Sequence, residues 1–479
     1  MIESILLENF RIWGGRHEIP LRPLTCIYGP NSSGKSSIMY GLLVLRQTLE
    51  NADGPQVYLK SIGKYADVGD FKNLIHSHNA ELTLRLGLAF RGNRNNRSVE
   101  RKDTLRRITL EFKSFGSLQG MAKLEKFTIE IASDTALTFC AEMDGFGLEE
   151  SGGSKFRDYL VDSLHPVMKD NLSDSFESSL GMITDRMKFE FKNGMPSRMT
   201  WMDHSEVTDE QKLDLDQLSA AWLSLADHLR EELFNQLSRF RHIGPLRQPL
   251  SRIMTHSGQC REGKGVGTRG ENIVELLASL GDQEVRFRGE KKKLIEQIND
   301  CLSSMCYDYS IDLETTDKLN GTGVLRILTL QQKSTGTWAK PFDVGSGISQ
   351  SLPIVIQLLS EPSKSHFIEQ PEVHIHPSLQ VELAQLMVDI VNEIEYNTQI
   401  VCETHSPEIL LRILGEVKSK NLNNQLLSLL YIEPPLVALT DTTKCLIMEV
   451  NEYGSVKKPW PGGFFPEREA EARGYRSGK

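Results

Sequence analysis

Alternation of apolar and polar residues in the first part of the chain predicts β-strands. The pattern is clearest over Met1–Phe10, Glu81–Phe90 and Arg107–Phe112. Because Arg91–Arg97 is rich in Gly, Asn and Arg, we expect an exposed turn there, within an antiparallel meander. Irregular strands and polar loops are expected to continue over residues 116–205.

Helical spacing of apolar residues dominates the chain after this strand-rich part. One helix is predicted from Leu213 to Phe240, and a second helical tract from about Asn272 to Met305, with breaks near Gly281 and Gly289. Pro353 is placed in the first turn of a later helix, where proline is tolerated. The remaining predicted elements are helices over 349–360, 381–395 and 406–415 and strands over 325–330 and 399–403.

A glycine-rich loop stands between an apolar run, Leu24–Tyr28, and a segment with helical potential, Ser37–Leu45. The loop, Gly29–Ser36, reads GPNSSGKS and matches the phosphate-binding pattern G-x-x-x-x-G-K-[ST]. A strand, a loop and a helix in this order point backbone N–H groups at an anion. Lys35 would then reach the β- and γ-phosphates of ATP, and the Ser36 hydroxyl would hold Mg²⁺. The predicted ATP-binding residues of this loop are Asn31, Ser32, Ser33, Gly34, Lys35, Ser36 and Ser37.

Composition narrows the class of protein without indicating a function. A chain of 479 residues is long enough for roughly two or three domains, and 39% hydrophobic and 25% charged residues are typical of globular proteins. No apolar stretch approaches the ~20 residues of a membrane span, and we expect no secretory leader and no membrane partner. The seven cysteines form no C-x-x-C pair, so we expect no zinc site and a reduced, cytoplasmic protein.

Further motifs follow downstream in a fixed order. Asp343–Gln350 reads DVGSGISQ, Ile368–Glu372 reads IEQPE, and Glu403–Pro407 reads ETHSP. Together with Gly29–Ser36, these segments resemble the P-loop, signature, Walker B and switch-histidine motifs of ABC-type ATPases in the RecF/SMC/OLD-like branch. The tail segment Trp460–Phe465 also resembles a subgroup of prokaryotic AAA ATPases. Many of these are encoded beside a nuclease and act in phage defence, in Septu-like or related two-component systems.

The resemblance implies an α/β fold and a division of the chain. The fold would be an ABC-type P-loop ATPase head, with a mixed sheet flanked by helices, an antiparallel β subdomain and an inserted arm of strands and helices. The likeness covers about residues 1–70 and 340–465. The expected units are an N-terminal ATPase lobe with the P-loop and the β meander (1–115), an inserted β then helical arm (116–240), a helical and strand return segment (241–335), a C-terminal ATPase lobe with the other motifs (336–432) and a tail (433–479).

The signature segment implies a second copy of the chain. By resemblance, Ser346 and Gly347, with Gly345 and Ser349, would contact the γ-phosphate of an ATP molecule bound by the opposite protomer. The chemistry is sensible, because a hydroxyl and glycine N–H groups at the start of a helix form an anion site. The expected assembly is a homodimer, or a higher oligomer, bridged by ATP between the heads.

The Walker B segment departs from the family pattern at one position. Glu369 would carry the carboxylate on the Mg²⁺ side, but Gln370 stands where these ATPases usually have the glutamate that activates water. An amide can orient water but cannot accept its proton at neutral pH, so we expect slow ATP hydrolysis. We favour Gln370 as the water-positioning residue, and Glu372 is the alternative, as a base. His405 matches the switch histidine that senses the γ-phosphate.

Two other patterns have a functional and a structural interpretation each. His374 and His376 form an H-x-H pair, which can bind a metal, but no third ligand is evident. Basic residues within 91–107 and 286–293 could contact DNA phosphates, or could be ordinary solvated side chains. Because the net charge is −9, any DNA-binding surface would have to be a local patch.

The leading functional hypothesis is an ATP-dependent dimeric switch that hydrolyses ATP slowly and controls a separate effector protein in anti-phage defence. A nuclease is the expected effector, and it would be another chain, because this sequence shows neither an H-N-H-like pattern nor the acidic cluster of a TOPRIM domain. The alternative is a RecF/SMC-like DNA-repair ATPase that clamps DNA directly. A transporter ATPase is disfavoured by the absence of an apolar span.

Overall fold

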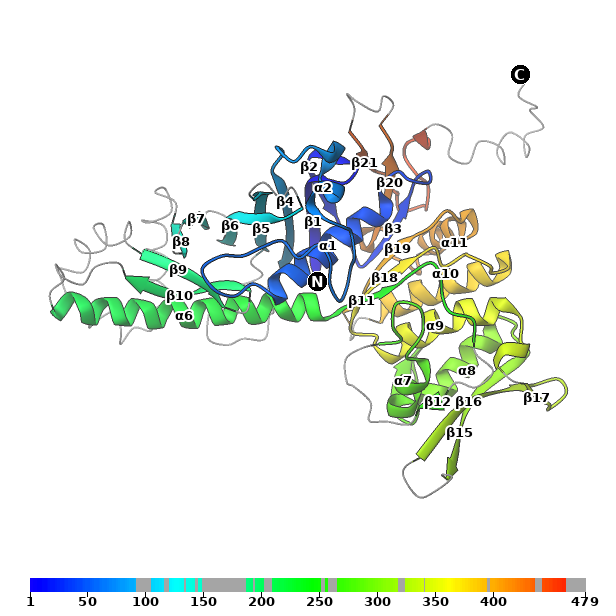
Figure 1. Cartoon of the computed structure of the whole chain (residues 1–479). Coiled ribbons are helices and arrows are strands. Elements are labelled where there is room, and N and C mark those ends of the chain that lie inside the picture. Colours follow the sequence, from blue (N-terminus) through cyan, green and yellow to red (C-terminus); the bar gives the residue numbers. More distant parts are fainter. Residues whose placement is uncertain are drawn as a thin grey trace.

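The computed structural model of the chain describes most of its residues. The described residues are 1–91, 105–115, 120–132, 135–142, 145–148, 187–192, 194–201, 209–250, 255–256, 265–317, 324–339, 341–393, 397–435 and 442–461. Two large sheets dominate the structure, one parallel in most of its strands and one antiparallel. The antiparallel sheet and the long helix α6 extend together to one side of the molecule (Figure 1).

A six-stranded sheet brings the two ends of the chain together. Its order is β11 (Phe240–Ile243), β18 (Ser365–Glu369), β19 (Gln399–Glu403), β3 (Leu24–Tyr28), β20 (Leu427–Glu433) and β21 (Lys444–Ile447). Strands β11 to β20 are parallel, and β21 is antiparallel to β20. The strand that precedes the glycine loop therefore lies between two strands from the other end of the chain.

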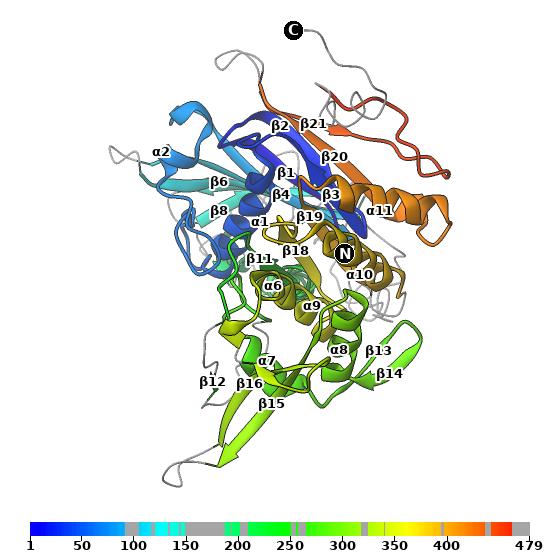
Figure 2. The ribbon, with the colours of Figure 1, turned by 90° about the vertical axis from the view of Figure 1, so that its right-hand side faces the viewer.

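Both faces of this sheet are buried, which explains its almost continuously apolar strands. Ile27 and Val401 belong to a core shared with α1 (Lys35–Glu50) and the antiparallel sheet. Cys26 and Cys402 belong to a second core, on the face covered by α9 (Ser346–Ser360), α10 (Pro377–Asn392) and α11 (Pro407–Lys418). This layered arrangement confirms the predicted α/β fold, and Figure 2 shows helices on both sides of the sheet.

The antiparallel sheet contains the predicted meander. Its nine strands lie in the order β10-β9-β8-β7-β6-β5-β4-β1-β2, and β4 pairs with β5 as expected. The bounds are β1 (Ile2–Phe10), β2 (Trp13–Pro20), β4 (Leu84–Arg91), β5 (Leu105–Ser114), β6 (Ala122–Ala132), β7 (Thr135–Glu142), β8 (Gly145–Leu148), β9 (Met187–Lys192) and β10 (Met195–Trp201). Helix α1 lies between this sheet and the six-stranded one, so the phosphate-loop helix is enclosed by both (Figures 1 and 2).

A long helix, α6 (Asp209–Ser238), packs against the end of the antiparallel sheet. The Trp222 indole N–H donates to the Pro196 carbonyl at 3.0 Å. The helix ends earlier than its apolar spacing predicted, because Phe240 begins β11 and pairs with Ser365 of β18. Edge pairing in the six-stranded sheet therefore overrides helical periodicity at this boundary.

The segment between α6 and the signature motif forms a small α/β unit. It contains α7 (Ile273–Leu280), the hairpin β13 (Glu284–Phe287) and β14 (Glu290–Lys293), α8 (Leu294–Ser304) and a sheet of β12 (Thr255–His256), β15 (Tyr309–Asp317), β16 (Val324–Gln332) and β17 (Trp338–Ala339). Gly281 ends α7 and Gly289, at φ +78°, makes the hairpin turn, so the predicted breaks at both glycines are confirmed. The prediction of a helical tract is wrong over residues 284–293, which pair as the β13–β14 hairpin. The short helices are α2 (Phe71–Leu74), η1 (His76–His78), η4 (Pro341–Asp343) and η6 (Asn424–Leu426).

Helix α9 starts before its predicted position. It begins at Ser346, so Pro353 lies in the helix interior and not in the first turn. Leu352, Ile354 and Val355 are almost completely buried around it, and this packing offsets the missing N–H of the proline.

Membrane-crossing helices are not seen in the described ranges, where no helix combines sufficient length with sufficient hydropathy.

Candidate nucleotide-binding site

The glycine loop connects β3 to α1 through two positions that only glycine fits well. Gly29 and Gly34 have φ angles of +149° and +95°, in the region that disfavours side chains. A Cβ on Gly29 would lie 2.5 Å from the Ile432 carbonyl oxygen, and one on Gly34 would lie 2.5 Å from Ile12. The loop therefore passes close to its neighbours at both glycines.

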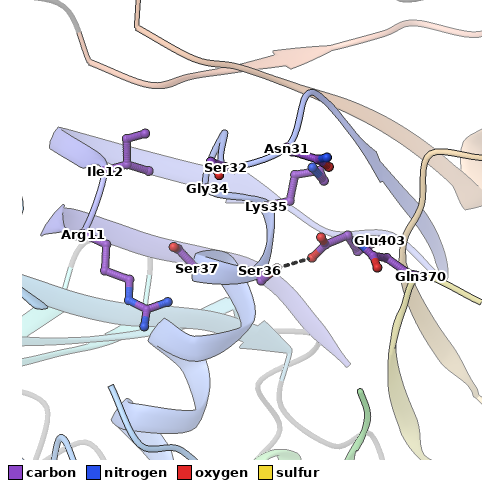
Figure 3. Close-up of a pocket in the computed structure, with 10 residues that line it drawn as sticks. All are labelled: Arg11, Ile12, Asn31, Ser32, Gly34, Lys35, Ser36, Ser37, Gln370 and Glu403. Carbon is purple, nitrogen blue, oxygen red and sulfur yellow. Dashed lines mark hydrogen bonds between the residues drawn. The ribbon is translucent and has the colours of Figure 1, made fainter. Parts of the chain in front are cut away.

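Lys35 and Ser36 begin α1 and point toward the loop and the sheet, respectively. Lys35 Nζ donates to the carbonyls of Gly29 at 3.0 Å and Pro30 at 2.7 Å, and burial lowers the pKa of this lysine. Ser36 Oγ donates to Glu403 Oε2 at 2.8 Å (Figure 3). The start of α1 is thus held to the C-terminal end of β19.

A pocket opens in front of these groups, with a volume of about 320 Å³. Most of the loop residues predicted to bind ATP line it, together with Gln370 from the Walker B segment. The lining residues are Arg11, Ile12, Asn31, Ser32, Gly34, Lys35, Ser36, Ser37, Gln370 and Glu403. Ser33, although part of the loop, is buried and is not among them. Figure 3 shows the side chains of Glu403 and Gln370 opposite the start of α1.

Two carboxylates end adjacent strands beside the pocket, and one of them, Glu403, lines it. Glu369 ends β18, Glu403 ends β19, and the two residues are direct register partners. Burial, followed by the nearby charge of Glu369, raises the pKa of Glu403 to about 7. Glu369 Oε1 lies 2.7 Å from His242 Nε2 on β11. The side of the pocket formed by Glu403 is therefore acidic, and Lys35 is a nearby cation.

These groups fit a Mg²⁺ ion by their chemistry. Mg²⁺ in nucleotide sites is bound by oxygen ligands, usually one or two carboxylates together with phosphate oxygens and water. The serine hydroxyl and the two strand-end carboxylates supply such oxygens at the pocket. Among the described residues no group of three or more His, Cys, Asp or Glu side chains could hold a metal.

Gln370 has a strained backbone that two neighbours hold in place. Its φ of +43° is in the left-handed region, which is uncommon for a residue with a long side chain. Its N–H donates to the Glu403 carbonyl at 2.7 Å. The Arg247 guanidinium donates to the Glu369 carbonyl at 2.6 Å and, at 3.4 Å, to the Gln370 carbonyl. This geometry turns the Gln370 side chain into the pocket.

Glu372, the alternative base, is engaged elsewhere. Its Oε1 accepts the His405 N–H and its Oε2 accepts the Thr404 hydroxyl, both at 2.7 Å. Burial raises its pKa. Glu372 does not line the pocket, so the structure places Gln370, and not Glu372, in front of the loop.

His405 follows β19 and precedes α11, as the motif predicted. Burial, followed by the charge of Lys35, lowers the pKa of His405 to about 4, so its ring is neutral near pH 7. Its side chain is partly buried and is not among the groups that line the pocket. The His405 ring is therefore close enough to Lys35 for the lysine charge to lower its pKa, but it is not part of the pocket wall.

The signature segment lies outside the pocket. Gly345 is exposed and precedes α9, Ser346 opens the helix, and Gly347 is partly buried. Ser349 is only 5% exposed in the single chain, and its proposed membership of a phosphate-contacting signature segment stays a prediction. One turn in, Gln350 donates to the Arg247 carbonyl at 3.3 Å. Helix α9 is thus linked through Arg247 to the backbone of Gln370.

The other candidate ligands have structural roles. His376 precedes α10 as its N-cap, and its Nδ1 lies 2.8 Å from the Ser378 hydroxyl. His374 is exposed and is part of no metal cluster among the described residues.

The basic tracts are locally paired where the structure describes them. In 91–107, Arg107 contacts Glu18 and Glu130, whereas Arg94, Arg97, Arg101 and Lys102 lie outside the described residues. In the β13–β14 hairpin and the start of α8, acidic neighbours accompany the cations. The pairs are Arg288–Asp389, Lys291–Glu284, Lys292–Glu290, Lys292–Asp300 and Lys293–Asp282. This pairing weakens the second tract as a phosphate-binding surface.

The tail motif is described only at its beginning. The Trp460 ring packs edge-on against Tyr28, at the end of β3, with ring centroids 5.5 Å apart. It also contacts Tyr431 of β20, at 6.0 Å. Residues 462–465 of this motif lie outside the described residues.

Several residues of the site were not predicted from the sequence. Arg11 and Ile12 reach the pocket from the turn between β1 and β2, and His242 and Arg247 come from the return segment. Glu403 is the first residue of the ETHSP segment, and an acid at the end of the apolar run of β19 is the sequence signal that indicates it.

Comparisons with known proteins agree with this geometry. Residues 1–143 match a family model described as "AAA ATPase domain", and residues 196–411 match one described as "AAA domain, putative AbiEii toxin, Type IV TA system". Over 42 residues the chain is 55% identical to "Structural maintenance of chromosomes protein 1B" of Homo sapiens and 52% identical to that of Mus musculus. These matches cover 9% of this chain and only 3% of the length of each curated relative.

Similar solved structures are heads of SMC proteins. One is a Smc head bound to the C-winged helix domain of ScpA, with TM-score 0.41 and 11% identity, covering 94% of this chain and 98% of that chain. Another is the SMC head domain from Thermotoga maritima, with TM-score 0.39 and 10% identity, covering 94% and 99%. The AAA models and the arrangement of the motifs support an ABC-type ATPase, and the predicted head fold is confirmed.

Proposed function

We propose that this ATPase is a cytoplasmic, slowly hydrolysing switch whose ATP-bound heads dimerise and control a separate effector, a nuclease, in anti-phage defence. The observation that carries the proposal is Gln370, which faces the pocket at the position after the Walker B acid. An enzyme that binds ATP firmly and cleaves it slowly keeps its ATP-bound state for long, which is the behaviour of a switch.

The pocket residues would divide the work on ATP between them. The loop N–H groups and Lys35 would bind the phosphates, and Ser36 with the strand-end carboxylates would hold Mg²⁺, which neutralises phosphate charge. Gln370 would orient the attacking water through its amide, without accepting a proton from it. His405, neutral near pH 7, would donate or accept a hydrogen bond at the γ-phosphate.

Dimerisation is supported by the position of the signature segment. Gly345 is exposed at the start of α9, and a Cβ there would meet nothing within 4 Å. An open helix start with glycine N–H groups can accept an anion from another molecule. We therefore propose that a second copy presents its ATP to Gly345, Ser346 and Gly347.

The proposal of a separate effector protein is supported by one family match and by the lack of a nuclease motif in the sequence. One matching family is described by a toxin of a type IV toxin–antitoxin system, which is a two-component context of the kind proposed here. The chain shows no nuclease motif of its own. A separate nuclease would then be restrained or released by the nucleotide state of the heads.

A second candidate is an ATPase that clamps DNA directly, as in chromosome maintenance. The local identity to SMC protein 1B favours it. The pairing of the cations in the β13–β14 hairpin argues against that surface as the clamp. Tight DNA binding by the isolated chain, with a steep salt dependence, would favour this candidate over the switch.

The test of the proposed switch is the variant Gln370→Glu, which supplies the missing base. We expect ATP turnover to rise by about 10- to 100-fold, since a positioned general base contributes about 10²-fold or more. Turnover is measured by phosphate release with saturating ATP, and Gln283→Glu, at an exposed position between α7 and β13, serves as the control for added charge. Equal turnover in Gln370→Glu and the unchanged protein would contradict the slow-switch mechanism.

A further inference from the structure

The C-terminal end of β19 places an acid where the phosphate loop and the Walker B strand meet. We infer that Glu403 supplies a carboxylate oxygen to the Mg²⁺ ion that accompanies ATP, alongside Ser36 and Glu369. The inference rests on the proposed nucleotide site and adds to it a residue outside the P-loop and Walker B motifs.

Strand order is the first argument. In the six-stranded sheet the strand order is β18-β19-β3, so the strand carrying Glu403 lies between the Walker B strand and the P-loop strand. Glu403 is the register partner of Glu369 on one side and of Ile27, two residues before the loop, on the other. A carboxylate at the end of β19 is therefore nearer to the loop than one at the end of β18.

The contact with Ser36 is the second argument. Ser36 is the loop residue whose hydroxyl the motif assigns to Mg²⁺, and this hydroxyl donates to Glu403 Oε2 at 2.8 Å. Figure 3 shows the Glu403 carboxylate directed at the start of α1. Two oxygens within hydrogen-bond distance of each other can become neighbouring ligands of one ion, because adjacent ligands of octahedral Mg²⁺ lie about 3 Å apart.

The neighbours of Glu369 are the third argument. Its Oε1 is 2.7 Å from His242 Nε2, on the side of β11, away from the P-loop strand. Glu369 is thus partly committed to another contact, whereas Glu403 faces the serine. A divalent cation between the two acids would also offset the repulsion between their charges.

The experiment compares nucleotide binding with and without the metal. The dissociation constant of the non-hydrolysable analogue AMP-PNP is measured by calorimetry in Mg²⁺ and in EDTA, for the full chain and its variant Glu403→Gln. Mg²⁺ should increase the affinity of the unchanged chain for AMP-PNP relative to EDTA. We expect this increase to be about 10- to 100-fold smaller in the variant. In EDTA the variant should bind AMP-PNP as tightly as the unchanged chain or more tightly, because one negative charge near the phosphates is gone.

Glu433→Gln is the matched control, because Glu433 ends β20, the other neighbour of β3, and does not line the pocket. It should keep the full effect of Mg²⁺. If Glu403→Gln keeps it too, or loses affinity equally in EDTA, the inference is overturned. Failure of the unchanged chain to bind AMP-PNP in either condition would overturn the nucleotide site itself, which is a separate and recognisable result.

A second variant covers the case in which Glu403→Gln fails to fold. Glu403→Asp keeps the charge but withdraws the carboxylate by one methylene, and Mn²⁺ replaces Mg²⁺ as a spectroscopic probe. We expect the electron paramagnetic resonance spectrum of bound Mn²⁺·AMP-PNP to differ between this variant and the unchanged chain. Identical spectra would overturn the inference.

Discussion

The nucleotide pocket and the start of α9 both carry motif residues, but only in the pocket are these residues held by contacts within the chain. In the pocket, Lys35 and Ser36 already have hydrogen-bond partners, and the Gln370 backbone is held from both sides. At the start of α9, Gly345 is exposed and has no neighbour within 4 Å of a Cβ position. One region is complete within the chain, and the other presents a helix start to solvent.

This difference indicates which steps need a second molecule. Binding of ATP should be a property of the single chain, because the loop, Ser36 and the carboxylates come from one sheet and its flanking helix. Contact of the signature segment with a phosphate should require the proposed dimer. Arg247 connects the two regions, since it contacts Gln350 of α9 and the carbonyl of Gln370.

The largest expected effect is the loss of nucleotide binding in Lys35→Ala. Removing a charged donor from the phosphates should weaken ATP binding by about 100-fold, the equivalent of about 3 kcal/mol. Calorimetry on the isolated chain measures it, with Lys64→Ala, on the surface beside Tyr65, as the control. Unchanged ATP affinity would mean that the pocket is not the nucleotide site, and the contrast drawn between the pocket and the start of α9 would be wrong.

A change at the start of α9 should weaken dimerisation and leave ATP binding by the single chain intact. Gly345→Asp places a negative charge where the partner's phosphate is proposed to lie, and the open space around Gly345 accommodates the side chain. We expect ATP binding by the single chain to persist and ATP-dependent dimerisation to weaken by about tenfold or more, because like charges repel.

Analytical ultracentrifugation with and without ATP measures this dimerisation. Gly415→Asp, at another position with free space but on α11, is the matched control and should dimerise normally. If both variants dimerise like the unchanged chain, the start of α9 is not the interface.

The connection between the two regions is tested at Arg247. Arg247→Lys should lower ATP turnover by about tenfold at unchanged ATP affinity, since a lysine lacks the planar, multi-donor fork with which the guanidinium contacts the Glu369 and Gln370 carbonyls. If Arg247 acts through Gln370, the two changes should not be additive, so Arg247→Lys should have no further effect in a Gln370→Ala background. Additive losses of turnover would indicate a general structural role.

The smallest expected effect concerns the sheet beneath the pocket. Burial lowers the pKa of His366 in β18 to about 4, below its usual value of 6.5, despite the raising influence of Glu361 and with Arg241 and Arg239 nearby. The unfolded chain therefore binds a proton that the folded chain excludes. The stabilisation is fully present above pH 6.5 and is lost as the pH falls toward 4.

We expect this histidine to reduce the free energy of unfolding by about 1 kcal/mol between pH 6.5 and about pH 5.5. Urea unfolding at both pH values measures the change, and His366→Gln should remove this part of it. An equal decrease in the variant and the unchanged chain would contradict the assignment.

The sequence predicted those parts of the fold and site in which a local pattern is sufficient. The bounds of β3 and β19 agree with their apolar runs, and the loop residues Asn31 to Ser37 are adjacent in the chain. Glu403, His242 and Arg247 could not be assigned in this way, because their contacts depend on the order of strands in the sheet. The burial of Ser349 likewise depends on how α9 packs, which helical spacing alone does not determine.

The position of β3 in its sheet has a consequence for how the protein is made. The strand leaves the ribosome early, but both strands that flank it, β19 and β20, are translated more than 300 residues later. Closing so long a loop is costly and slow, so nascent and truncated chains should carry the phosphate loop without an assembled site. An incompletely synthesised chain would therefore not bind ATP.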